Sequence, residues 1–156
     1  MWDELNNQIE NLYQQKKYLE AFNVAKEALK VAEDTFEPNH PNIVTSLNWL
    51  ALLYSSQSKF AEAEQLYKRA LKIREKTLGK DHLDVATSLN NLAELYRVQS
   101  KYSEAESLFK KALTIREKAL GEDHLDVATS LNCLAWIYYS QKKYTKAEPL
   151  LKRVLA

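Results

Sequence analysis

Apolar side chains recur at helical spacing between residues 85 and 96. They fall at positions i, i+4, i+7, i+8 and i+11, and the alternation typical of a β-strand is absent. The apolar residues are Val85, Leu89, Leu92, Ala93 and Tyr96. The opposite sector is polar and carries Thr87, Asn90, Glu94 and Arg97. This pattern predicts an amphipathic helix. We expect Asp81 to be its N-cap residue and Asp84 to complement the positive helix start.

A second, broader apolar face follows the short segment 99–101. Its members are Tyr102, Ala105, Leu108, Phe109, Ala112, Leu113 and Ile115. A face this wide can contact two neighbouring helices. Gly79 and Gly121 each follow a leucine at the expected end of such a helix, where a residue with positive φ closes a helix at low cost. The chain has only two glycines and three prolines, too few for a series of β-hairpins. The sequence therefore predicts an all-α fold of antiparallel helix pairs.

The helix pair repeats along the chain with a period of 42 residues. The segment DHLDVATSLN occupies 81–90 and again 123–132, and a diluted copy lies at 38–48. Each repeat also places an alanine early in its second helix, at Ala21, Ala63, Ala105 and Ala147. A single pair cannot bury this much apolar surface, so the repeats are expected to stack through close helix contacts. We expect one array over residues 1–156, with repeats at approximately 1–36, 37–78, 79–120 and 121–156. The last repeat is expected to end within its second helix.

Two segments of the third repeat resemble the tetratricopeptide repeat. Residues 89–96 read LNNLAELY, and residues 101–106 read KYSEAE. The longer period, together with Leu-Gly-x-Asp-His and Ile-Arg-Glu-Lys, is similar to the 42-residue subclass found in kinesin light chains and in many bacterial repeat proteins. The resemblance implies a right-handed superhelical solenoid in which the first helix of each pair lines a concave groove.

The chain departs from that pattern at three kinds of position. Leu83 and Leu125 replace a proline that the second repeat keeps as Pro41. Other residues stand where glycine usually separates the two helices, so these turns are expected to be tight or slightly strained. The residues are Ser58, Ser100 and Lys142. Pro149 falls inside the last helix, where we expect a mild kink and not a break, because proline forfeits one backbone hydrogen bond.

The charge balance excludes several classes of partner. The 22 basic and 21 acidic residues give a net charge of +1 and are interspersed, which does not indicate binding to nucleic acid or to a membrane. Cys133 is the only cysteine, so no internal disulfide can form and a reducing cytoplasm is expected. The longest apolar run, 49–54, is too short to span a bilayer, and the first residues do not resemble a signal peptide. We expect a cytoplasmic protein, or a soluble fragment of a larger one.

No residue pattern indicates catalysis. His40, His82 and His124 recur at one position of the period, so in stacked repeats they would lie too far apart to hold one metal ion, and we interpret them as structural residues of the loops. Cys133 lacks a C-x-x-C context and is expected to be a packing thiol. Nucleotide-binding, nucleophile-elbow and zinc-protease motifs are absent. We expect no enzyme activity, no cofactor and no metal.

The polar sector of the first helices is the candidate binding surface. An asparagine can both donate to and accept from a peptide backbone, and neighbouring aromatic residues can supply pockets. The predicted peptide-binding residues are Asn6, Asn48, Asn90, Asn132, Tyr13, Glu94, Arg97, Trp136 and Tyr139. The resemblance to kinesin light chains implies a ligand with an aromatic residue among acidic ones. The simpler alternative is that the asparagines only solvate the helix, although asparagine is a poor helix former.

We therefore predict a non-enzymatic scaffold that binds an extended peptide segment of a partner protein. A ladder of lysines near the edge of the groove is a weaker indication of an acidic ligand. Its members are Lys17, Lys59, Lys101 and Lys143. One alternative is an assembly module that self-associates weakly through its repeat ends, and the other is an excised or designed repeat fragment. The apolar residues at the last repeat end are Leu150, Leu151, Val154 and Leu155.

Overall fold

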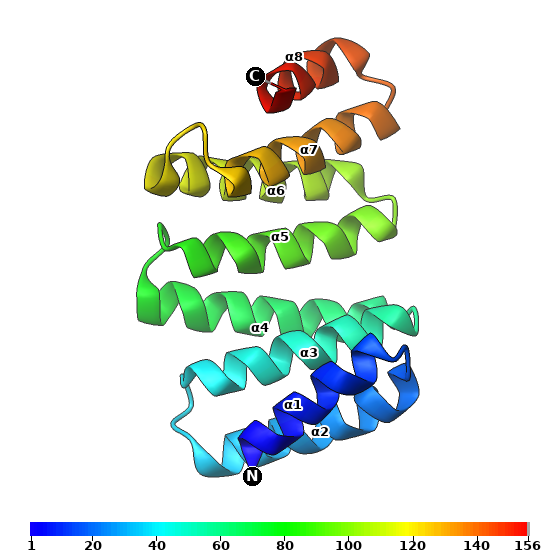
Figure 1. Ribbon diagram of the computed structural model, residues 1–156, viewed down its shortest axis with the longest axis vertical. Helices are drawn as coiled ribbons and strands as arrows, with labels where there is room; N and C mark the ends of the chain where they lie inside the picture. Colours follow the sequence, from blue (N-terminus) through cyan, green and yellow to red (C-terminus); the bar gives the residue numbers. More distant parts are fainter. Residues whose placement is uncertain (156) are drawn as a thin grey trace. The chain divides into compact units, whose positions relative to one another are not determined.

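The computed structural model describes residues 1–155, and this part of the chain consists of eight α-helices without a β-strand (Figure 1). The helices are α1 (Trp2–Gln14), α2 (Tyr18–Thr35), α3 (Pro41–Ser56), α4 (Phe60–Leu78), α5 (Leu83–Val98), α6 (Tyr102–Leu120), α7 (Leu125–Ser140) and α8 (Tyr144–Leu155). They form two compact units, Met1–Thr77 and Leu78–Ala156. Within each unit, consecutive helices run antiparallel (Figure 1). The predicted all-α fold of repeated helix pairs is confirmed, and the predicted repeat boundaries remain predictions.

The apolar stripes form a separate core in each unit. In the second unit, Phe109 and Leu113 of α6 belong to one cluster with Val127, Leu131 and Leu134 of α7. The first unit has its own cluster, which includes Ile9, Phe22 and Leu47. The repeated alanines Ala21, Ala63, Ala105 and Ala147 are 0–3% exposed. A side chain larger than alanine at these positions would have to displace tightly packed neighbours. The prediction that these positions are close helix contacts is confirmed.

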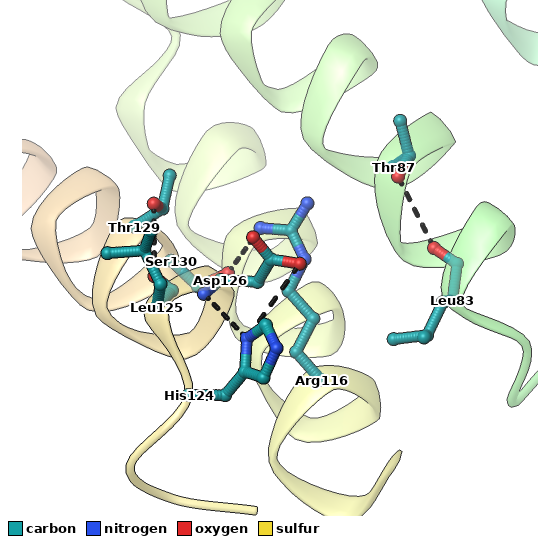
Figure 2. Close-up of polar contacts among 8 residues, drawn as sticks. All are labelled: Leu83, Thr87, Arg116, His124, Leu125, Asp126, Thr129 and Ser130. Atoms are coloured by element: carbon teal, nitrogen blue, oxygen red, sulfur yellow. Dashed lines mark hydrogen bonds and ion pairs between the residues drawn. The ribbon is translucent and has the colours of Figure 1, made fainter. Parts of the chain in front are cut away.

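Histidine, and not aspartate, is the N-cap residue of three helices. His82 precedes α5, and its Nδ1 accepts a hydrogen bond from the backbone N–H of Asp84 at 3.0 Å. His124 caps α7 in the same way (Figure 2). His40 does so at the start of α3. The prediction that Asp81 caps this helix is therefore wrong. Asp81 lies one residue further out, where its carboxylate is 3.8 Å from the ammonium group of Lys118. The imidazole takes the capping role because it satisfies one of the N–H groups that a helix start leaves without a partner.

The turns inside the four helix pairs share one backbone conformation. The second residue after each first helix has a φ of 61°, at Lys16, Ser58, Ser100 and Lys142. At Ser100, the N–H of Lys101 donates to the carbonyl of Tyr96, and the N–H of Ser100 donates to that of Arg97, both at 2.9 Å. This is a Schellman motif, whose left-handed position costs a non-glycine residue about 1–2 kcal/mol. The strain predicted at these turns is present, and Lys16 shares it.

The loops and the last helix also follow the prediction. Gly79 and Gly121 have positive φ angles of 90° and 87°, as expected at the ends of the second helices. Pro149 lies inside α8, which continues through it to Leu155. The predicted absence of a helix break at this proline is confirmed.

Buried serine hydroxyls link neighbouring helices at one position of the repeat. Ser130 of α7 is 0% exposed and accepts a hydrogen bond from the Arg116 guanidinium of α6 at 2.6 Å (Figure 2). Ser46 of α3 is 1% exposed and accepts one from the indole N–H of Trp2 in α1 at 2.8 Å. A buried hydroxyl without a partner would be unfavourable, so these contacts favour one alignment of the two helices over others.

Candidate functional site

The second unit contains an open pocket of about 700 Å³ in which five of the predicted peptide-binding residues meet. These five are Glu94, Arg97, Asn132, Trp136 and Tyr139, and the remaining lining residues are Cys133, Ala135 and Leu151. The pocket is thus built from α5, α7 and α8. Asn90 lies in the same unit but is not among the lining residues, and Asn6, Tyr13 and Asn48 lie in the first unit.

Helical spacing brings the lining residues together. Asn132, Trp136 and Tyr139 occupy positions i, i+4 and i+7 of α7 and therefore share one face of that helix. Glu94 and Arg97 occupy, on α5, the repeat positions that Trp136 and Tyr139 occupy on α7, 42 residues later. An ion pair from α5 and an aromatic pair from α7 thus line the same pocket.

The two aromatic rings are open to solvent. Trp136 is 54% and Tyr139 55% exposed, and their rings are nearly parallel, with 16° between the planes and 6.2 Å between the centroids. Tyr139 also makes an edge contact with Tyr144 of α8, at 5.3 Å between centroids. Exposed aromatic rings that are held in place by one another can bind a further apolar or planar group without losing much side-chain entropy.

Glu94 and Arg97 form a hydrogen-bonded ion pair on α5. The Nε of Arg97 lies 3.0 Å from both carboxylate oxygens of Glu94, and its Nη2 contacts Oε1. These hydrogen bonds raise the pKa of Arg97 above its ordinary value. The two charges are separated by one helical turn, so the pair exists within α5 itself. The guanidinium is therefore already bound when a ligand arrives.

Cys133 lines the pocket as a neutral thiol. The side chain is half-buried, and burial raises its pKa above the ordinary value, with a further contribution from the Glu94 carboxylate. A raised pKa lowers the thiolate fraction, so the thiol is a weak nucleophile at neutral pH. The expectation of an unreactive thiol agrees with this environment, but the sequence did not indicate that it borders a pocket.

A difference between repeats marks this position. Cys133 stands where the second repeat has Trp49, and Arg97 stands where the first repeat has Tyr13. In the first unit Tyr13 and Trp49 are in contact, with ring centroids 5.4 Å apart, and Tyr13 also contacts Tyr18. Two large rings pack together there, whereas in the second unit the smaller thiol borders open space. The change in side-chain size at one repeat position was the available signal for the pocket.

The asparagine ladder is not uniform. The Oδ1 atoms of Asn6, Asn48 and Asn90 are buried without a donor among the described protein atoms. Asn132, in contrast, is exposed at the pocket. An unsatisfied buried acceptor costs about 1–3 kcal/mol, so the asparagines are not explained by solvation of the helix surface alone.

Among residues 1–155, no three His, Cys, Asp or Glu side chains are grouped closely enough to hold a metal ion. The three histidines are instead engaged as helix caps. In the same part of the chain, no helix has the length and hydropathy that a membrane span requires.

Sequence comparison identifies the class of protein. The tetratricopeptide repeat family model matches residues 5–76, 43–118 and 84–156, in overlapping segments that cover nearly the whole chain. The chain therefore belongs to the tetratricopeptide repeat family. No curated protein sequence matches it.

Several solved structures share the fold. A Podosopora anserina protein described as a kinesin light chain with nearly identical TPR-like repeats has a TM-score of 0.86 at 24% identity, over 97% of this chain and 72% of that one. BtubC (BKLC) from P. vanneervenii has a TM-score of 0.84 at 25% identity, over 98% of this chain and 60% of that one. A Rap protein complexed with competence and sporulation factor has a TM-score of 0.83 at 22% identity, over 97% of this chain and 40% of that one. The predicted similarity to kinesin light chain-like repeat proteins is confirmed at the level of the fold.

Tetratricopeptide repeat proteins of this kind are generally non-enzymatic scaffolds for protein–protein interaction. The fold of this chain is typical of such scaffolds, and the Rap protein is one neighbour whose structure contains a bound partner, competence and sporulation factor.

Proposed function

We propose that this chain binds an extended peptide segment of a partner protein along the face formed by α5 and α7, with one large aromatic side chain in the pocket of the second unit. The observation that carries this proposal is the pocket itself, which is about 700 Å³ in volume and brings together a polar amide and two exposed aromatic rings. Pockets of this size suit a group as large as an indole or phenol ring.

The chemistry of the lining supports an aromatic occupant. Trp136 and Tyr139 offer ring faces and edges, and Leu151, Ala135 and Cys133 offer apolar surface. Asn132 adds an exposed amide, which can donate to a peptide carbonyl and accept from a peptide N–H. The side chain of the ligand would supply contact area, while its backbone would be held by the amide.

The predicted asparagine ladder extends this binding surface beyond the pocket. Asn90 precedes Asn132 by one repeat, and Asn6 and Asn48 occupy the same repeat position in the first unit. We propose that Asn90 and Asn132 bind backbone groups of one peptide, and that Asn6 and Asn48 form a corresponding surface within the first unit. A cytoplasmic location is part of the proposal, and the single cysteine of the chain supports it.

The test is a comparison of two exposed apolar side chains on the same helix. We expect Trp136→Ala to weaken binding of the peptide acetyl-Ala-Gln-Trp-Gln-Ala-amide about tenfold, which corresponds to about 1.4 kcal/mol, because a ring in the binding pocket is lost. The matched control is Leu125→Ala, since Leu125 is 77% exposed on α7 but does not line the pocket. The dissociation constants are measured by chemical-shift titration. Equal weakening by both substitutions, or a wild-type protein that does not bind the peptide, would contradict the proposal.

Self-association through α8 is the second candidate. Leu155 is 87% and Leu151 44% exposed, and apolar side chains this open favour association. Sedimentation over a concentration series distinguishes this candidate, because Leu155→Glu should then remove a concentration-dependent dimer. A wild-type chain that stays monomeric throughout the series would eliminate it.

A further inference from the structure

The guanidinium of Arg97, one of the predicted peptide-binding residues, already has a carboxylate partner in the pocket. Arg97 is held by Glu94 through both Nε and Nη2, and both residues line the pocket. The side chain of Arg97 is 29% exposed and that of Glu94 is 50% exposed, so both remain accessible to a ligand. A ligand carboxylate could reach Arg97, but only in competition with Glu94.

The pocket lining as a whole carries no net charge. Glu94 and Arg97 cancel one another, and the other lining side chains, including the thiol of Cys133, are neutral. The lysines of the predicted ladder in this unit, Lys101 and Lys143, are not among the lining residues. Inside the pocket, Arg97 is thus the only positively charged side chain, and its charge is compensated.

We propose that Glu94 determines the charge selectivity of this pocket: by occupying Arg97 it excludes acidic groups and directs the site to uncharged aromatic side chains. The proposal rests on the peptide-binding function proposed above and narrows its ligand class. The sequence predicted an aromatic-acidic peptide, whereas the pocket geometry assigns the aromatic part to the pocket and leaves acidic residues without a free positive charge there. Glu94 acts here as an internal competitor of a ligand carboxylate.

The physical reason is the geometry of the pair. Glu94 and Arg97 are three residues apart on one helix, so their contact loses little entropy when it forms. A carboxylate on a flexible peptide must be ordered before it can make the same hydrogen bonds. It would also approach the negative charge of Glu94 itself, which lowers affinity further. Removal of the Glu94 charge should therefore convert a neutral pocket into one that binds an anion.

The experiment compares two peptides on three proteins: the wild type, one variant and one control variant. The peptides are acetyl-Ala-Gln-Trp-Gln-Ala-amide and acetyl-Ala-Glu-Trp-Glu-Ala-amide, which differ only in charge. The variant is Glu94→Gln, which keeps the shape of the side chain and frees Arg97. The matched control is Glu104→Gln, which changes the net charge equally at an exposed position of α6 outside the pocket. Chemical-shift titration gives the six dissociation constants. Circular dichroism on the same samples shows whether the fold is retained.

We expect wild-type protein and Glu104→Gln to bind the neutral peptide at least as well as the acidic one. Glu94→Gln should improve binding of the acidic peptide relative to the neutral one by about threefold to fivefold, the range of a partly exposed ion pair. This gain should decrease in 1 M salt, where charges are screened beyond about 3 Å. An unchanged ratio between the two peptides in Glu94→Gln, or a wild-type preference for the acidic peptide, would overturn the role of Glu94. If the neutral peptide does not bind the wild type at all, the proposed function itself fails.

Discussion

At the scale of single residues, the imidazole caps are the clearest case in which a repeated residue has a structural task. His40, His82 and His124 accept a backbone N–H at 3.0 Å through Nδ1, at the start of α3, α5 and α7. The sequence placed a histidine at this position of three repeats but did not say which atom it uses. Asp81 was the stronger candidate by ordinary capping preference, because aspartate is among the favoured N-cap residues. The geometry of the loop decides in favour of the next residue.

The cap predicts a specific effect of substitution. His82→Ala should lower the free energy of unfolding by about 0.5–2 kcal/mol, because one backbone N–H of α5 loses its partner. His82→Asn should retain most of the stability, since an asparagine oxygen can accept the same hydrogen bond. Urea unfolding followed by circular dichroism measures both variants. Equal loss of stability in the two would show that the imidazole acts through something other than capping.

At the scale of helices, the close contact at the repeated alanines determines how tightly each pair packs. Ala105 of α6 is 0% exposed and belongs to the core cluster of the second unit, together with Ala93 of α5. These positions were predictable from the sequence because the same small residue recurs in every repeat at the same distance from an aromatic one. The recurrence of a small residue at this position indicates a close helix contact, and the periodicity of the sequence is enough to detect it.

Enlargement of this alanine should destabilise the fold. Ala105→Leu adds three carbon atoms at a position that is already tightly packed, so it should lower the free energy of unfolding by about 1–3 kcal/mol. The matched control is Ala119→Leu, since Ala119 lies on the same helix but is exposed. Urea unfolding of the two variants gives the comparison. An unchanged midpoint for Ala105→Leu would contradict the packing described here.

At the scale of the whole molecule, the sequence predicts the repeat class well and the pocket only in part. The 42-residue copies, the helix stripes and the glycines with positive φ all indicate the same fold, because each reflects a local constraint that is repeated. Five of the eight pocket residues were predicted, since they lie on the polar sector of their helices. The division into two compact units was not predicted, because it depends on contacts between residues distant in the sequence.

The residues that sequence reasoning missed share a physical explanation. Cys133 was expected to be a packing thiol, and Leu151 was considered only as part of an apolar helix end. Ala135 was not predicted at all. All three border the pocket because of the residues that surround them in space. The pairing of Arg97 with Glu94 could have been predicted from their spacing on α5. Its effect on the net charge of the pocket could not, because that charge also depends on which other residues line the pocket.

Chemical-shift mapping is the sharpest test of whether the second unit binds an aromatic side chain between α5 and α7. In this measurement, 15N-labelled protein is titrated with acetyl-Ala-Gln-Trp-Gln-Ala-amide, and every backbone and side-chain amide signal is followed. We expect the largest shifts at the indole N–H of Trp136, the side-chain amide of Asn132 and the backbone amides of Tyr139 and Arg97. The indole N–H of Trp2, which donates to Ser46 in the core of the first unit, should not move. Shifts that leave these pocket residues unchanged, or that centre on another surface, would contradict binding at this site.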